Sequence, residues 1–79
     1  MSSISICAVI PTLNEEEHVA QCIAELKNQS VSQIIVADGG SDDRTIEIAR
    51  ELGVEVASSQ RGRGHQLQAA IDHTDCDLI

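Results

Sequence analysis

A short apolar run that ends at an acid and two glycines constrains the fold of this chain more than any other feature. The run is Ile34-Ile35-Val36-Ala37, and Asp38, Gly39 and Gly40 follow it directly. Four apolar residues without a polar interruption predict a strand buried on both faces, as in a parallel sheet. Ligands of open α/β sheets bind at the carboxyl ends of the strands. We therefore expect Asp38 to face a ligand and the two glycines to let that ligand approach the backbone.

Strand-like and helix-like segments alternate along the rest of the chain, which predicts an α/β fold with a parallel sheet and right-handed crossovers. Apolar and polar residues alternate over 54–58, which indicates an edge strand. We therefore expect one Rossmann-like domain over residues 1–79 with the sheet order 3-2-1-4, the strands being numbered along the chain. The expected segments are strands at 4–10, 34–38, 54–58 and from 77, and helices at 15–28, at 45–52 and around Leu67, Ala70 and Ile71.

Residues at the segment ends predict where strands and helices stop. Pro11 removes a backbone donor and is expected to close the first strand. Asn14 is a favoured helix N-cap, and a glutamate follows it at the capping-box spacing. Ser41 or Asp42 is expected to cap the second helix, and Gly53 stands where a helix-ending glycine belongs.

The charge and the first loop argue against nucleic-acid and dinucleotide binding. Thirteen acids against five Lys and Arg give a net charge of −8, whereas nucleic-acid binding needs clustered basic residues. Dinucleotide binding needs a G-x-G-x-x-G loop after the first strand. That loop, residues 11–17, contains three acids and no glycine, and a Walker A sequence is also absent. A pyrophosphate would be repelled at this loop.

Acids after the first two strands and a basic loop later in the chain suggest a nucleotide site. Glu15 and Asp38 can accept hydrogen bonds from a base and a ribose, because carboxylates accept from hydroxyl and N–H groups. Gly62-Arg63-Gly64, with Arg61, lies in a stretch without acids and precedes a helix, so it can receive a diphosphate. The alternatives are a solvated first turn for Glu15, a turn-capping role for Asp38 and a flexible polar loop at 61–64.

The cysteines and the hydropathy bear on the location of the protein. Cys7, Cys22 and Cys76 form no C-x-x-C pair, which favours three small, buried or half-buried thiols in a reducing compartment over a disulfide framework or a zinc site. No apolar run approaches the ~20 residues that a transmembrane helix needs. We therefore expect a cytoplasmic location, free or peripheral at a membrane.

Three segments in order resemble the amino-terminal part of family 2 glycosyltransferases, which have the GT-A fold. They are Ile10-Pro11-Thr12-Leu13-Asn14-Glu15-Glu16, the segment from Ile35 to Thr45, and the segment from Gly62 to Ala70. The resemblance implies a nucleotide-diphospho-sugar donor, usually a UDP-sugar, and an acceptor hydroxyl. It implies that Pro11, Thr12 and Glu15 line the nucleoside site, that Asp38 recognises the base, and that Gly62, Arg63 and Gly64 pass near the diphosphate. Gln68 stands where the family commonly has Asn.

The resemblance also implies what this chain lacks. In the family a D-x-D motif that holds Mg²⁺ or Mn²⁺ follows the fourth strand, and the catalytic base comes later. Asp75-Cys76-Asp77 precedes that strand and does not substitute for the motif. We expect no metal ligand and no catalytic residue before Ile79, so that the 79 residues alone are inactive. The truncated sheet predicts an exposed edge at the fourth strand and self-association through it.

Two other functions fit the same fold. One is a non-catalytic α/β module that binds a nucleotide or a partner protein. The other is a nucleotidyltransferase, which is expected to carry a basic, glycine-rich loop after the first strand. Residues 11–17 are the opposite of such a loop. A strand followed by D-x-D in the continuation of the chain would support glycosyl transfer over both.

Overall fold

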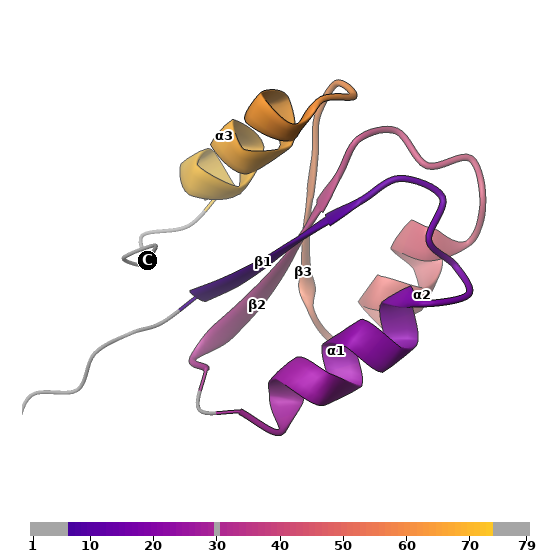
Figure 1. Ribbon diagram of the computed structural model, residues 1–79, viewed down its shortest axis with the longest axis vertical. Coiled ribbons are helices and arrows are strands. Elements are labelled where there is room, and N and C mark those ends of the chain that lie inside the picture. The colour runs from indigo at the N-terminus through magenta and orange to yellow at the C-terminus, as the bar shows by residue number, and fades with distance from the viewer. Residues whose placement is uncertain (1–6, 30, 74–79) are drawn as a thin grey trace, which may run out of the picture.

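Helices cover both faces of a small parallel sheet in the computed structural model, which describes residues 7–29 and 31–73. In Figure 1, α1 and α2 lie on one side of the sheet and α3 lies on the other. Strands and helices alternate, which confirms the expected α/β class. The elements are β1 (Cys7–Thr12), α1 (Val19–Lys27), β2 (Gln33–Asp38), α2 (Thr45–Glu51), β3 (Glu55–Ser58) and α3 (Arg63–His73).

The sheet order is β1-β2-β3, with β2 in the middle. Thr12 pairs with Asp38, and Asp38 pairs with Ser58, so the three strands end level with one another. The polar residues at these ends therefore meet at one edge of the sheet. The expected fourth strand lies outside the described residues, so the full order 3-2-1-4 and self-association through that strand stay predictions.

β2 is buried on both faces, as its apolar run predicts. Ile34 and Val36 face α1 and α2, whereas Ile35 and Ala37 face α3. The two faces differ in side-chain size, because alanines dominate the α3 side. The cluster on the α1 and α2 side consists of Val19, Ile23, Ile34, Val36 and Ala49, and the cluster on the α3 side of Ile35, Ala37, Ala57 and Ala70.

α3 forms where the sequence predicts a third helix, but of the three apolar residues that mark this helix only Ala70 is buried. Gln66 and Ala70 are buried, whereas Leu67 is 47% and Ile71 is 42% exposed. Positions four residues apart share a helix face, so burial of Gln66 and Ala70 turns Leu67 and Ile71 outward. Leu67 instead borders a groove of about 290 Å³ beside Pro11.

The predicted caps of α1 and α2 are wrong. Asn14 has a left-handed φ of 54°, and α1 begins only after a turn in which the His18 and Val19 amides donate to the Glu15 carbonyl. The Asn14 Oδ1 accepts from the Asp42 amide instead, at 2.8 Å. At α2, the carboxylate that accepts from the Thr45 amide, at 2.9 Å, belongs to Asp43. The side chains of Asn14 and Ser41 thus bind across to the neighbouring loop, whereas Asp43 binds both the start of its own helix and the Glu16 amide.

Two other end signals have different outcomes. Gly53 follows α2 with a φ of 79°, which confirms it as the helix-ending glycine. Pro11 does not close β1, because the strand continues through it to Thr12. The Thr12 carbonyl accepts from the Gly39 amide, so the Pro11 nitrogen before it points away from β2 and its missing donor breaks no bond to that strand.

The prediction of buried or half-buried thiols is wrong at both cysteines that the structure describes. Cys7 is disulfide-bonded, whereas Cys22 is a free, exposed thiol. No helix in the described part of the chain is long and apolar enough to cross a membrane.

Candidate functional site

An open hollow of about 340 Å³ lies at the carboxyl end of β1, where the sheet rule predicts a ligand. One wall comes from the end of β1 and the loop after it, and the other comes from the start of α3. Six of the predicted residues therefore meet in one place although more than 40 positions separate the two walls. The lining residues are Pro11, Thr12, Leu13, Glu15, Arg61, Gly62, Arg63 and Gln66.

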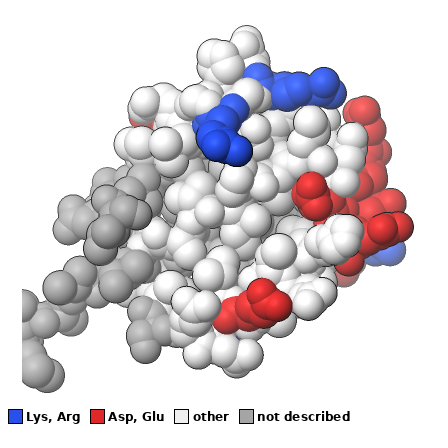
Figure 2. Space-filling model, in the orientation of Figure 1, with Lys and Arg blue, Asp and Glu red and all other residues white. Residues whose placement is uncertain are grey.

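The α3 wall is basic. Arg61 and Arg63 are exposed, and neither forms an ion pair within residues 7–29 and 31–73. Basic side chains gather at the top of the face in Figure 2, over the strand ends, whereas acidic side chains lie along its right side and at its lower edge. Gly62, between the two arginines, has a φ of 133°, which a side chain rarely allows. The loop thus presents two guanidinium groups and a helix start to the hollow, a combination that suits an anion.

The β1 wall is acidic and held by hydrogen bonds to the next loop. The Glu15 amide donates to the Thr45 hydroxyl at 2.8 Å, and the Asn14 amide donates to the Ser41 hydroxyl at 2.9 Å. The backbone of Glu15 is therefore fixed while its side chain stays 47% exposed, 3.6 Å from His18 Nδ1. An exposed carboxylate on a fixed backbone can accept hydrogen bonds from ligand hydroxyls.

Asp38 lies beneath the two loops and is fully buried. Its Oδ1 accepts from the hydroxyls of Thr12, at 2.7 Å, and Ser41, at 2.6 Å. Its Oδ2 accepts from the amides of Gly40, at 3.0 Å, and Ser41, at 2.8 Å. The carboxylate thus caps the turn after β2, which is the alternative role that the sequence left open for it. Through Thr12 it also joins this turn to β1.

These hydrogen bonds change the acidity of Asp38. Burial raises the pKa of Asp38, but the hydrogen bonds from Ser41, Thr12 and Gly40 together outweigh burial and hold the pKa below its ordinary value of 3.8. Hydrogen bonds to the charged form favour ionisation, because protonation would break them.

Stability is therefore expected to fall in acid. Asp38 has a lower pKa folded than unfolded, so its contribution is complete well above pH 3.8 and disappears as the pH falls from about 4 through the folded pKa. Urea unfolding between pH 6 and pH 3, followed by circular dichroism, would measure the loss. Asp38→Asn is expected to flatten this pH dependence, whereas Asp42→Asn, in the same loop, is expected to keep it. An unchanged slope in Asp38→Asn would contradict the assignment.

Gln66 is the main site residue that the sequence analysis missed. It is 7% exposed, and its Nε2 donates to the carbonyls of Thr12, at 2.9 Å, and Ala37, at 2.8 Å. Gly39 makes room for it, because a Cβ there would lie 3.0 Å from Gln66 Cδ. Gly39 therefore serves a close internal approach. The sequence signal that could have identified Gln66 was its spacing from Ala70. The two residues are four positions apart and therefore share a helix face, the inner one.

The remaining predicted residues lie outside the lining of the hollow. Gly40, with a φ of 102°, turns the chain so that its amide reaches Asp38. Gly64 lies within α3 with open space around it. Gln68 is exposed on α3 and donates to Asp72 at 3.0 Å. The structure does not bring Gly64 or Gln68 to the hollow, and their predicted roles have no supporting contact.

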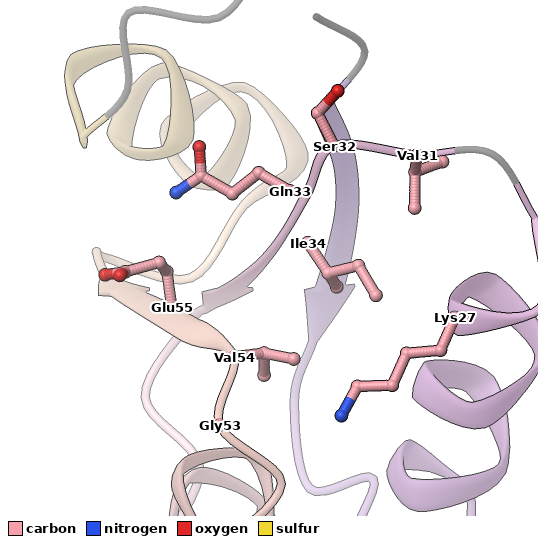
Figure 3. A pocket seen from close by; sticks show the side chains of 8 residues that line it. All are labelled: Lys27, Val31, Ser32, Gln33, Ile34, Gly53, Val54 and Glu55. Carbon is pink, nitrogen blue, oxygen red and sulfur yellow. The ribbon is translucent and has the colours of Figure 1, made fainter.

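A second hollow, of about 310 Å³, lies at the amino ends of β2 and β3 (Figure 3). Lys27 extends across it toward Gly53 and Val54, and its Nζ donates to the Leu52 carbonyl at 2.7 Å. This cation caps the carbonyl end of α2, where the helix dipole favours positive charge. Because ligands of α/β sheets bind at the opposite strand ends, we assign the functional site to the hollow at β1.

No group of three His, Cys, Asp or Glu side chains within residues 7–29 and 31–73 is arranged to hold a metal ion. Glu15 is the one acid among the described residues that line the hollow, and two acids, one at the end of β2 and one in the loop after it, bind protein donors. Asp38 binds hydroxyl and amide donors, and Asp43 binds the Thr45 amide and hydroxyl. These residues do not fit a divalent cation.

The parallel sheet, the flanking helices and the site at the strand ends define a Rossmann-like α/β domain. Residues 7–79 match the family model of Glycosyl transferase family 2, and the chain belongs to this family. The Haloferax volcanii "Glycosyltransferase AglJ" is 33% identical over 77 residues, which is 95% of this chain and 25% of that protein. A Petrotoga mobilis "Glucosyl-3-phosphoglycerate synthase" is 30% identical, covering 96% of this chain and 28% of the relative.

A solved structure has the same arrangement. Glucosyl-3-phosphoglycerate synthase from Mycobacterium tuberculosis, in complex with Mn²⁺, UDP and glucosyl-3-phosphoglycerate, superposes with a TM-score of 0.79 at 29% identity. The match covers 98% of this chain and 33% of that structure. The chain thus spans a quarter to a third of the length of these relatives.

Proposed function

We propose that this chain is the nucleotide-binding part of a family 2 glycosyltransferase that transfers a sugar from a UDP-sugar to an acceptor hydroxyl. The observation that carries the proposal is the hollow with a basic wall from Arg61 and Arg63 facing an acidic wall with Glu15. A nucleoside diphosphate has matching chemistry, with anionic phosphates at one end and hydroxyl and N–H donors at the other. The UDP complex of the M. tuberculosis enzyme supports the choice of nucleotide.

Each wall has a role in this proposal. Arg61 and Arg63, with the backbone at Gly62, hold the diphosphate through charge-assisted hydrogen bonds. Thr12, Pro11 and Glu15 contact the nucleoside. Base recognition by Asp38 remains part of the proposal on one condition. The Ser41 hydroxyl must first leave Asp38, because all four hydrogen bonds of that carboxylate are internal.

The metal belongs to the whole enzyme in this proposal. Mg²⁺ or Mn²⁺, when bound, offsets the charge of the leaving diphosphate. The M. tuberculosis complex contains Mn²⁺. The described residues do not fit such an ion, so we assign its ligands and the catalytic base to parts of the enzyme outside them. The 79 residues alone are then expected to bind UDP without transferring sugar.

Titration of UDP into the chain, followed by amide chemical shifts, tests the proposal. Shifts are expected at Thr12 and at Gly62 to Gly64. Arg61→Ala and Arg63→Ala should each weaken binding by roughly tenfold, because each removes a charge-assisted hydrogen bond of about 1.5 kcal/mol. Arg50→Ala, an exposed arginine on α2, should leave the affinity unchanged. Equal affinities for all three variants, or no shifts at millimolar UDP, would contradict the proposal.

A further inference from the structure

The side-chain amide of Gln66 has a determined orientation. Its Nε2 donates to the carbonyls of Thr12 and Ala37. Carbonyl oxygens only accept hydrogen bonds, so the NH₂ end of the amide must face them. A flipped amide would place three acceptors together. The Oε1 atom of Gln66 therefore points away from these two carbonyls and lies beside Gly39, where an added Cβ would be 3.1 Å from it.

Oε1 is an acceptor that a ligand can reach. Gln66 lines the hollow, and no described residue donates a hydrogen bond to its Oε1. Within residues 7–29 and 31–73 no buried side-chain oxygen or nitrogen lacks a partner. Oε1 has no partner among the described residues, and it is not a buried atom without a partner, so it must be accessible to solvent. Oε1 is thus a fixed, solvent-accessible acceptor on a residue that lines the hollow.

The position of Gln66 indicates which part of a nucleotide it meets. The Gln66 amide donates to the Gly62 carbonyl at 2.9 Å, so Gln66 lies one helical turn after the basic loop. Its side chain also reaches the end of β1 at Thr12. In a nucleoside diphosphate, the ribose is the group between the phosphates and the base. Gln66 lies between the segments assigned to these two groups.

We propose that Gln66 Oε1 accepts a hydrogen bond from a ribose hydroxyl of the nucleoside diphosphate, and so selects ribonucleotides over deoxyribonucleotides. The inference rests on the proposed function of the hollow. Because the amide is held by two strands, the acceptor is placed before the ligand arrives. A ligand that lacks the hydroxyl leaves a desolvated acceptor unpaired, which is how a polar site rejects an analogue.

The test compares UDP, 2′-deoxy-UDP and 3′-deoxy-UDP on the unaltered chain and on Gln66→Met, by calorimetric titration. The unaltered chain should bind one deoxy compound roughly fivefold more weakly than UDP, as expected for one lost hydrogen bond. In Gln66→Met that discrimination should disappear. A purely structural Gln66 would weaken all three ligands equally and keep the ratio, which would overturn the inference.

Controls separate folding from recognition. Gln21→Met, at an exposed position on α1, should keep both affinity and discrimination. If Gln66→Met does not fold, Gln66→Asn takes its place in the test. This variant keeps an amide but retracts its oxygen by one methylene, so it should also lose the discrimination. If every variant binds UDP and the ratio of the affinities for UDP and the deoxy compound is the same in all of them, this inference alone is overturned. No UDP binding to the unaltered chain would overturn the proposed function together with it.

Discussion

Asp38→Ala is expected to destabilise the chain by about 3 kcal/mol, because it removes a buried acceptor and leaves hydroxyl and amide donors unpaired. A domain of this size has a total stability of roughly 4–12 kcal/mol, so the variant should lie near the limit of folding. Urea unfolding followed by circular dichroism at 222 nm measures the effect. The chain contains no Trp, Tyr or Phe, which leaves no intrinsic fluorescence to follow.

Two variants make this prediction specific. Asp42→Ala removes an exposed acid from the same loop and should change stability by about 0.5 kcal/mol or less. Asp38→Asn keeps the size of the side chain but turns an NH₂ group toward donors. Its loss of stability should therefore fall between the losses of Asp38→Ala and Asp42→Ala. An Asp38→Ala protein as stable as the unaltered chain would mean that water replaces the carboxylate at little cost.

Gly39→Val is expected to cost about 3 kcal/mol, because the added atoms overpack a closed contact and break hydrogen bonds of Gln66. A Cβ at Gly39 would lie 3.0 Å and 3.1 Å from Gln66 Cδ and Oε1, and 3.3 Å from the Arg61 Cα. The glutamine can leave, but the backbone of Arg61 cannot move without shifting the basic loop. Stability and UDP affinity should therefore fall together.

Gly64→Val is the matched control, because a Cβ at Gly64 meets nothing within 4 Å. Its effect on stability should be about 0.5 kcal/mol or less. The double variant Gly39→Ala/Gln66→Ala should be more stable than the sum of its single changes predicts, since the smaller side chain at position 66 leaves room for the new methyl group. Strict additivity would contradict a direct contact between the two positions.

Patterns within one segment were sufficient for the fold class. The apolar run at 34–37 predicts a strand buried on both faces, and its two faces do pack against different helices. The alternation over 54–58 predicts an edge strand, and β3 lies at an edge of the described sheet. Such patterns are readable because side-chain direction has a fixed period along a strand or helix.

Contacts between distant segments were not readable in this way. Asn14 has the residue type of a helix cap, but the folded loops lie close enough for its side chain to accept from the backbone amide of Asp42. A capping residue chooses between its own helix and a neighbouring segment according to distance, which local sequence does not contain. The same limit explains why Asp43, and not Ser41 or Asp42, binds the start of α2.

The sequence by itself determined the α/β class, the central strand and most of the residues that line the hollow. The tertiary structure decided what Asp38 and Gly39 contact, since both were expected to face a ligand and both instead contact protein atoms. It also brought Gln66 under the strand ends, 54 positions from its partner Thr12. The physical reason is that residue type limits which bonds a side chain can make, whereas packing of the three strand ends determines which partner is within reach.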